Sequence, residues 1–447
     1  MSRPTPPSPG SGSDPLARNW SPDVPEIPAP KAYNLDLHFD DRGQCYWRRD
    51  EGGRYIKASV ASARRYLKTL GYSPKSEDGS PSALDRALEF VETCQNTYYA
   101  GALAGYKAGI YTINERRILV TSSPHFVDPV PGSWDTLAAI FDGLLGAEQC
   151  RWFYPWLRIA IEAGRLNRHR RGQALIIAGP PNCGKSLLQA IITELLGGRS
   201  ASPFAFLCGR TEFNSETFAA EHLTIEDQAA SSDPRVRKKF GHELKTLVAN
   251  LKHRCHAKNR EALDLTPIWR VSITLNDDPA SLLVLPQWED GLADKLMLFH
   301  ARAFKMPVDT SMPAGEETLW RQIRSELPAF VHHLETMAIP EDMKDSRFGV
   351  RFYHNADLLA LMDAQTDEMK LLELIDAKLF ADPQAGPWEG FARELEEELA
   401  GLSGLRPLLT SGNTCGLLLG ALARKKVRVE MLLKLHGSQR WRVHPPR

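Results

Sequence analysis

The stretch that most constrains this chain of 447 residues runs from Ala174 to Ser186 and reads ALIIAGPPNCGKS. Its first five residues, Ala174 to Ala178, have the length and β-branching of a strand that is buried on both faces. Residues 179–186 then match the spacing GxxxxGK[ST], and the apolar residues of 187–196 recur at helical spacing. A strand, a glycine-bounded loop and a helix in this order predict a cradle of backbone N–H groups for phosphate oxygens.

Every residue of the loop is a candidate for binding a nucleotide: Gly179, Pro180, Pro181, Asn182, Cys183, Gly184, Lys185 and Ser186. We expect Lys185 to reach the β- and γ-phosphates and the hydroxyl of Ser186 to hold Mg²⁺. The alternative is a chance glycine-rich turn between a strand and a helix, which the flanking context disfavours. The motif indicates ATP or GTP, but it does not say what nucleotide hydrolysis would drive.

The overall charge points to no partner, because Lys and Arg together number 55 and Asp and Glu together number 55. A nucleic-acid surface would therefore have to come from local segregation of charge. The seven cysteines, at 45, 94, 150, 183, 208, 255 and 415, include no CxxC pair, which argues against a zinc ribbon. Scattered cysteines suit a reducing compartment, and no apolar run approaches the roughly 20 residues of a membrane-spanning helix, so a cytoplasmic protein is expected.

Changes in composition predict six segments. They are a disordered leader (1–30), a small α+β module (31–130), a helical collar (131–171), a nucleotide-binding domain (172–306), a helical connector (307–354) and a C-terminal module (355–447). In the α+β module, hairpin turns are expected at 40–43 and 51–53, and helices over 61–71 and 82–104. Its residues Tyr46, Trp47, Arg48, Arg49 and Tyr55 could grip a nucleic acid, but a half-exposed hairpin face has the same composition, and that interpretation is favoured. The collar should contain two helices, over 133–146 and 150–164.

Two further polar positions follow short apolar runs downstream of the loop. Glu226 and Asp227 end the run LTIED, where one carboxylate would hold the metal and the other would orient the attacking water. Asn276 ends the run WRVSITLN, where its amide would position that water. Because the carboxyl ends of parallel strands meet at one edge of a sheet, we expect Ala178, Glu226 and Asn276 to converge on one crevice.

Residues 235–260 hold nine Lys or Arg and one acidic residue, Glu243. This local segregation in a neutral chain predicts either a nucleic-acid contact or a solvated basic helix face. The candidate DNA-binding residues here are Lys252, Arg254, His256, Lys258 and Arg260. One Cys and two His among residues 253–256 lack the spacing of a zinc site, so metal binding is not expected there.

The C-terminal module should begin with helices over 357–366, 369–380 and 388–402. A capped helix over 413–424 and two strands over 429–435 and 440–443 follow. Helices followed by a basic hairpin look like a winged helix, which makes Arg424, Lys425, Lys426 and Arg428 further candidates for DNA binding. Winged helices also make protein contacts, so both interpretations stay open.

The order GPPNCGKS, LTIED, basic segment and strand ending in Asn276 resembles superfamily 3 helicases of the AAA+ class. More closely, it resembles the viral, phage and plasmid primase-helicase branch related to the poxvirus primase-helicases. The stretch LKTLVANLKHRCHAKNREALDLTPIWRVSITLND resembles that branch's segment before its sensor asparagine, and QCYWRRDEGGRYIKAS resembles sequence found upstream of such ATPase domains.

This resemblance implies an α/β fold, with an AAA+ P-loop NTPase core flanked by the N-terminal α+β module and the C-terminal winged-helix-like module. Lys185 and Ser186 would be the Walker A pair, Glu226 and Asp227 the Walker B pair, and Asn276 the sensor. The segment before Asn276 would be a hairpin projecting into the channel of a hexameric ring. ATP and Mg²⁺ would be bound, and single-stranded or forked DNA would be the partner. The activity would be a DNA helicase or translocase in replication of a phage, prophage or mobile element. Because no metal-binding catalytic set is evident before residue 150, any primase is expected on another chain.

The sequence departs from the family at one point. An Arg-Arg pair usually follows the sensor, and one arginine acts on the neighbouring subunit's ATP, but residues 290–299 contain no such pair. Lys295 or Arg302 would have to substitute, and a lysine offers a point charge instead of a planar fork. An ATP-switched DNA-binding assembly or loading scaffold with little unwinding activity is therefore the alternative. A small-molecule kinase would need a lid arginine in place of the sensor asparagine and the basic segment.

Overall fold

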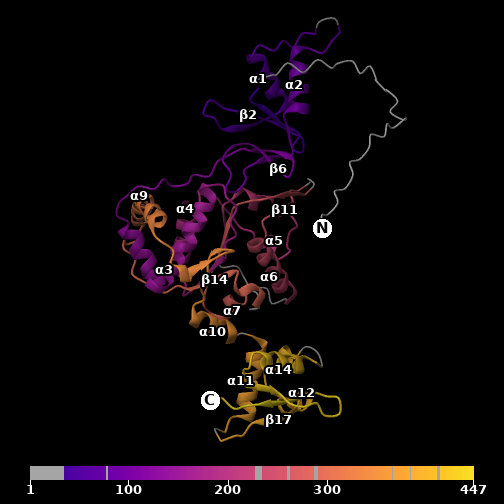
Figure 1. Cartoon of the computed structure of the whole chain (residues 1–447), viewed down its shortest axis with the longest axis vertical. Helices are drawn as coiled ribbons and strands as arrows, with labels where there is room; N and C mark the ends of the chain where they lie inside the picture. The colour runs from indigo at the N-terminus through magenta and orange to yellow at the C-terminus, as the bar shows by residue number, and fades with distance from the viewer. Residues whose placement is uncertain are drawn as a thin grey trace, which may run out of the picture.

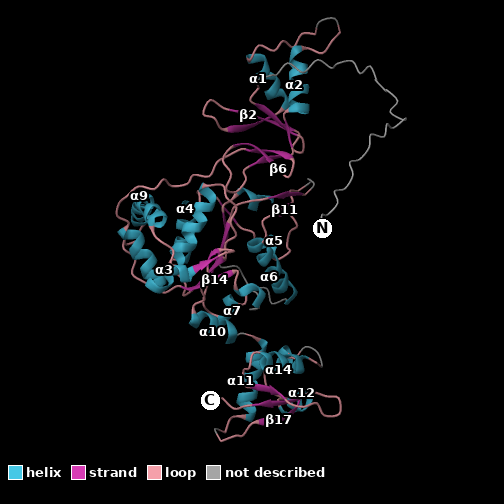
Figure 2. Cartoon of the chain, viewed as in Figure 1, coloured by secondary structure: helices cyan, strands magenta, loops and turns pink. Residues whose placement is uncertain are grey.

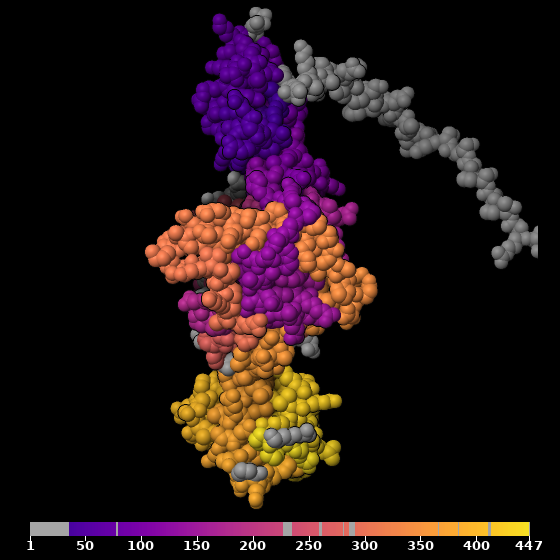
Figure 3. Space-filling view, turned by 90° about the vertical axis from the view of Figure 1, so that its left-hand side faces the viewer, coloured from indigo at the N-terminus to yellow at the C-terminus, as the bar shows by residue number. Residues whose placement is uncertain are grey.

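The computed structural model describes residues 35–76, 79–226, 234–258, 262–285, 290–364, 366–382, 384–409 and 413–446. An N-terminal module, a larger α/β body and a C-terminal module follow one another along the long axis of the molecule (Figure 1 and Figure 3). The leader expected over 1–30 lies outside the described residues, as do Asp227 and Arg260.

The N-terminal module is built on a four-stranded sheet in the order β3-β2-β1-β4. Its elements are β1 (Leu37–Asp40), β2 (Cys45–Arg49), β3 (Tyr55–Ala58), α1 (Val60–Thr69), α2 (Ala83–Cys94) and β4 (Asn96–Thr97). The two expected hairpin turns are confirmed, because β1 pairs with β2 and β2 with β3 in antiparallel register. One face of the sheet packs on the two helices, where Leu37 and Tyr46 share a core with Leu67 and Leu84.

The helix predicted over 82–104 is shorter than expected, since α2 ends at Cys94. The residues after it form β4 and β5 (Tyr99–Gly101), and β5 joins β6 (Gly109–Ile113) and β7 (Arg116–Val120) in a three-stranded sheet of order β5-β7-β6. The aromatic, β-branched and glycine residues over 97–101 have low helix propensity, because aromatic and β-branched side chains lose rotamer freedom in a helix and glycine loses backbone freedom there. They are therefore found in strands instead.

The collar is one long element, α3 (Asp135–Arg165), interrupted at Gly146, whose backbone angles are φ 75° and ψ 159°. The two predicted helices are therefore present and run into one another. A Cβ at Gly146 would lie 3.1 Å from Nη2 of Arg302, so the break is also a point of close packing.

The central body is organised around a parallel five-stranded sheet in the order β14-β8-β13-β10-β9. Its strands are β8 (Ala174–Ala178), β9 (Ser200–Ala201), β10 (His222–Glu226), β13 (Arg270–Leu275) and β14 (Leu296–His300). Every residue of β8 and β13 is buried, as the continuous apolar run at Ala174 predicts for a parallel strand covered on both faces.

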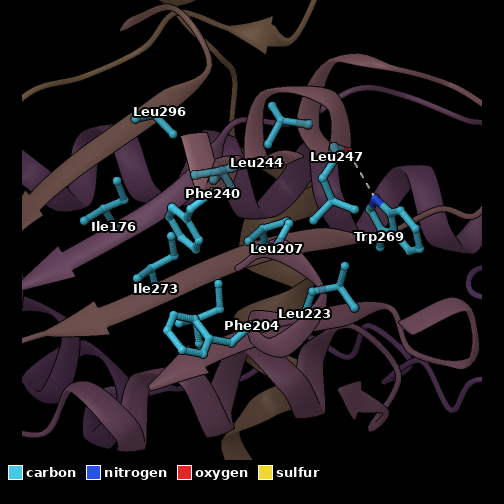
Figure 4. Packing of buried hydrophobic residues seen from close by; sticks show 14 of the residues in the cluster. Ile176, Phe204, Leu207, Leu223, Phe240, Leu244, Leu247, Trp269, Ile273 and Leu296 are labelled. Atoms are coloured by element: carbon cyan, nitrogen blue, oxygen red, sulfur yellow. Dashed lines mark hydrogen bonds between the residues drawn. The ribbon is translucent and has the colours of Figure 1, made fainter. Parts of the chain in front are cut away.

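Helices cover both faces of this sheet. On one face, Leu175 and Met297 pack with α3, α4 (Lys185–Leu195) and α9 (Pro313–Thr336). On the other face, Ile176 and Ile273 pack with Phe204 of α5 (Phe204–Leu207) and with α6 (Pro234–Ala249), as Figure 4 shows. The loop at 179–184 follows the carboxyl end of β8 and leads into α4.

Short elements connect these layers. They are η1 (Ser215–Ala219), β11 (His253–Cys255), β12 (Leu263–Leu265), α7 (Pro279–Leu282), α8 (Asp290–Ala293), η2 (Glu341–Met343), β15 (Lys344–Asp345), β16 (Gly349–Val350) and α10 (Ala356–Ala364). Among the described residues, no helix has the length and apolarity that a bilayer crossing would require.

The C-terminal module has a core of its own, centred on Leu371, Leu395, Leu419 and Trp441. Its elements are α11 (Asp367–Leu379), β17 (Trp388–Phe391), α12 (Ala392–Glu398), α13 (Leu405–Leu408), α14 (Thr414–Arg424), β18 (Val429–Met431) and β19 (Arg440–Val443). The prediction of a helix over 388–402 is wrong at its start, because Trp388–Phe391 pairs with β19 in a sheet of order β17-β19-β18 (Figure 2).

Candidate nucleotide site and nucleic-acid interface

Lys185 is the first residue of α4 and lies at the mouth of the loop. Its Nζ donates hydrogen bonds to the carbonyl oxygens of Gly179 (2.8 Å) and Pro180 (2.7 Å). It also donates to Oδ1 of Asn276 at 3.2 Å. Two residues that the sequence singled out separately therefore meet at one point of the sheet edge.

The loop requires glycine at two positions. A Cβ on Gly179 would lie 2.4 Å from the carbonyl oxygen of Ala301, and Gly184 has φ 104°. Asn182 also has positive φ, 58°, a conformation that asparagine tolerates better than most residues. These constraints direct the chain into the start of α4, and the start of a helix favours an anion.

The strand ends expected to converge do lie along one edge. Glu226 is the last residue of β10, is exposed, and pairs in register with Thr274 of β13. Because β13 lies between β8 and β10, Asn276 sits between the loop and Glu226. Asp227 falls outside the described residues, so its role stays a prediction. Within the described ranges, no group of three or more His, Cys, Asp or Glu side chains is placed to hold a metal ion.

Beneath this edge lies a buried polar network that we did not predict. Nε2 of Gln189 donates to the Ser272 carbonyl (3.2 Å) and hydroxyl (2.9 Å), and the Thr274 hydroxyl donates to Oε1 of Gln189 (3.1 Å). The Ser272 hydroxyl also contacts Nε2 of His222 at 2.7 Å, while Nδ1 of His222 lies 2.7 Å from the Thr193 hydroxyl. Complete burial lowers the pKa of His222 to about 3, so its ring is neutral near pH 7.

The network joins α4, which carries Lys185, to the two strands that lead to Glu226 and Asn276. Hydrogen bonds across a dry interface fix the relative position of these elements more strictly than apolar contacts do. A signal was present in the sequence, because Ser272 and Thr274 interrupt an otherwise apolar strand.

A second brace ties the segment after Asn276 to β14. Nε2 of His300, the last residue of β14, lies 3.1 Å from Oδ2 of Asp277. The backbone of His300 is held in turn by Gln149 of α3, whose Oε1 accepts from His300 N (2.7 Å) and whose Nε2 donates to His300 O (2.8 Å). The loop at 179–184 is thus flanked by fixed elements on both sides.

The basic segment contains an antiparallel hairpin of β11 and β12. Lys252, Arg254 and Lys258 are exposed, and His256 is half-buried. His253 and Cys255 point inward, and the His253 ring packs 4.8 Å from the Trp269 ring. The strand therefore alternates between a core face and a basic outer face, which explains why cations and buried residues are interleaved in the sequence.

Two asparagines from distant segments hold this hairpin. Asn214 exchanges hydrogen bonds with both backbone groups of His256 and donates from Nδ2 to the Arg254 carbonyl at 2.9 Å. On the other strand, Nδ2 of Asn114 donates to the Asp264 carbonyl at 3.2 Å. Phe213, next to Asn214, is 42 % exposed, and its ring lies 5.1 Å from His256. Sequence reasoning missed all three residues, because their relation to the hairpin is made only by the fold.

The geometry of Lys295 does not fit a residue that reaches into a neighbouring subunit. The side chain is 7 % exposed, and its Nζ donates to the Gly291 carbonyl at 2.7 Å and to the Asp294 carboxylate at 2.5 Å. Lys295 also precedes β14, at the sheet edge opposite the loop. Arg302 is closer to the site, but its guanidinium donates to the carbonyls of Asp142 and Gly143.

One basic residue of the C-terminal module also needs a correction. Arg428 is engaged within the module, because its guanidinium binds both carboxylate oxygens of Asp376 (2.8 and 2.5 Å) and the His444 carbonyl (2.9 Å). Arg424, Lys425 and Lys426 are exposed. Arg428 is therefore a structural residue and not a free contact for DNA.

Comparison with known proteins supports the fold but names no family. No protein-family model matches the sequence, and no curated protein sequence matches it. Among solved structures, the C-terminal region of NrS-1 is similar over 92 % of this chain and 96 % of that one, with TM-scores of 0.57 and 0.54 in two apo structures and 13 % identity. The SCCmec type IV Cch active helicase also matches, with a TM-score of 0.31 and 11 % identity, a likeness too weak to carry weight. The chain therefore shares its fold with the NrS-1 C-terminal region.

Proposed function

We propose that this protein is an ATP-dependent DNA helicase or translocase of superfamily 3 type, with an AAA+ core. The observation that carries the proposal is the contact between Nζ of Lys185 and Oδ1 of Asn276, at the sheet edge where Glu226 also ends its strand. Such a motor needs a loop that binds phosphate, a polar residue at the end of a neighbouring strand, and a basic hairpin. Here Asn276 follows β13, and the basic hairpin leads into the start of β13.

The side chains at the edge fit ATP and Mg²⁺ by donor type. The Ser186 hydroxyl and the Glu226 carboxylate are oxygen ligands of the kind Mg²⁺ prefers, and both side chains are exposed. Mg²⁺, when bound, neutralises charge on the phosphates and orients them. Lys185 exchanges its carbonyl partners for phosphate oxygens, Asn276 orients a water molecule, and Asp227 joins Glu226 in the acid pair.

On this proposal the β11–β12 hairpin contacts single-stranded or forked DNA in the channel of a hexameric ring. Lys252, Arg254, Lys258 and Arg260 contact phosphates, His256 lies beside them, and the exposed ring of Phe213 offers a stacking surface. If each of about six subunits makes one phosphate contact, affinity falls on the order of a thousandfold between 50 and 200 mM salt.

We infer that the C-terminal module is a winged helix, which the order of its helices and its three-stranded sheet support. Arg424, Lys425 and Lys426, at the end of α14, would then contact DNA or another protein. We place the protein in the cytoplasm, in replication of a phage, prophage or mobile element, with any primase on a separate chain.

The alternative is an ATP-switched assembly or loading scaffold with little unwinding activity. The buried position of Lys295 favours it, because the residue nearest to the family's missing arginine pair has no access to a neighbour. A strand-displacement assay on forked DNA separates the two functions. The motor unwinds the fork with ATP, whereas the scaffold binds ATP and DNA and leaves the duplex intact.

A further inference from the structure

The N-terminal sheet has a second face, turned away from α1 and α2. Side chains alternate along a strand, so Trp47 and Arg49 project opposite to Tyr46 and Arg48. Tyr46 and Arg48 belong to the helix side, where Arg48 lies over the Tyr66 ring. The register places Trp47 between His38 and Lys57, and pairs Arg49 with Tyr55. We call His38, Trp47, Arg49, Tyr55 and Lys57 the outer face.

The polar groups of the outer face are mostly hydrogen-bond donors. Lys57 is exposed and forms no ion pair within the described ranges. The indole N–H of Trp47 and Nδ1 of His38 are buried and form no hydrogen bond, so the donors that this face presents to solvent are those of Lys57 and Arg49. Arg49 is 43 % exposed, and its guanidinium lies 4.8 Å over the Tyr55 ring. A surface with more donors than acceptors favours a ligand rich in acceptor oxygens.

Carboxylates on this face are few and already engaged. Asp36 lies 3.6 Å from His38 and 3.4 Å from Arg49. Asp40 is 2 % exposed and accepts from Gly43 N. Burial, together with the nearby positive charge of Arg117 of β7, lowers the pKa of the His38 ring to about 4. Arg49 is paired with Asp36, so Lys57 and Arg117 supply the remaining positive charge on this side of the sheet.

The outer face is continuous with the hairpin through the second sheet. The turn between β6 and β7 bonds to β12 through Asn114, and β7 brings Arg117 next to His38. Figure 1 shows the β6 sheet between the β2 sheet and β11. A strand leaving the basic hairpin would pass the three-stranded sheet before it meets the outer face.

We propose that the outer face is a second nucleic-acid-binding surface, with Arg49 and Lys57 on backbone phosphates and Trp47 stacked on a base. This role is separate from ATP turnover, and it uses a module that the proposed motor chemistry leaves without a function. The shared ligand chemistry is the sugar-phosphate backbone, which single-stranded and duplex DNA both present.

The test compares two double variants of the full chain in a Lys185→Ala background, which removes turnover. Arg49→Ala/Lys57→Ala removes one arginine and one lysine from the outer face. Arg65→Ala/Lys68→Ala removes the same two residue types from α1, where both are exposed. Fluorescence anisotropy with labelled single-stranded and duplex DNA is measured from 50 to 200 mM salt, and thermal melting checks that each variant is folded.

We expect the outer-face variant to lower the slope of log affinity against log salt by about 1.4 on single strands or about 1.8 on duplex, which is two phosphate contacts. The α1 variant should keep the parent slope, and the arm with the larger loss identifies the form of DNA. Equal slopes in the parent and both folded variants would overturn the inference, as would equal losses in the two variants. Normal DNA stimulation of ATPase, measured on the same outer-face variant with Lys185 retained, would leave the motor proposal standing.

Discussion

At the scale of single residues, the site depends on Lys185, which is held by two carbonyls and by Asn276. We predict that Lys185→Ala lowers kcat for ATP hydrolysis by about 10²-fold or more, because the developing phosphate charge loses its nearest cation. Steady-state phosphate release measures this effect. Arg65→Ala on the N-terminal module is the control and should retain the parent rate. A Lys185→Ala protein with normal turnover would remove the site assignment.

His222 makes a pH-dependent contribution to stability. Its pKa is about 3 in the folded protein, below the ordinary value of 6.5, so the unfolded chain binds more protons between these values. Stability should therefore fall as pH drops from 6.5 toward 3, by up to about 1.4 kcal/mol per pH unit for this group. Denaturant unfolding at several pH values should show a shallower dependence for His222→Gln than for the parent. Identical slopes would mean that His222 is not buried in its neutral form.

The residues that carry a motif could be predicted from the sequence, whereas their supports could not. Lys185 is identified by spacing alone, and its meeting with Asn276 follows from strand order. Gln189, His222 and Asn214 have no motif, because their partners lie far away in sequence. The place of Lys295 in the chain suggests a trans-acting cation, but contacts with Gly291 of α8 and with Asp294 keep its side chain buried.

At the scale of elements, the β11–β12 hairpin is held from outside by Asn214, which bonds both backbone groups of His256. We predict that Asn214→Ala loosens the hairpin and reduces DNA-stimulated ATPase several-fold, with little change in the rate without DNA. ATPase titrations with single-stranded DNA measure both quantities. Equal losses with and without DNA would place Asn214 in general folding and not in support of the hairpin.

In the C-terminal module, Arg428 is expected to contribute to stability through its ion pair with Asp376. Removing its bidentate contact to half-buried Asp376 should cost about 2 kcal/mol of that module's stability. Arg428→Ala should therefore lower the melting temperature, while Lys425→Ala, which removes an exposed charge, should not. If Arg428→Ala instead weakened DNA binding without altering the melting curve, Arg428 would be a DNA contact after all.

Element types were predictable where a short apolar run is buried on both faces, as in β8 and β13, and where apolar residues recur at helical spacing, as in α4. They were not predictable over 97–101 and 388–391, where short segments become strands because a partner strand is available. Over four residues, intrinsic propensity changes the free energy of a strand or a helix only slightly. Pairing with a distant strand therefore decides which of the two forms.

At the scale of the whole molecule, one chain of neutral overall charge combines three features. They are the sheet edge at Lys185, the basic β11–β12 hairpin and the outer face of the N-terminal sheet. The fold is shared with the NrS-1 C-terminal region. In the proposed hexameric ring, contacts between subunits would form the DNA track and supply the trans-acting residue.

The central claim is that ATP turnover at Lys185 is coupled to nucleic acid at the hairpin. The most direct test is the ATPase rate of the full chain with and without single-stranded DNA at low salt, for the parent and for Lys258→Ala. We expect this coupling to raise the parent rate when DNA is added, and we expect Lys258→Ala to lose most of the stimulation while keeping its rate without DNA. A parent rate that DNA leaves unchanged would contradict it.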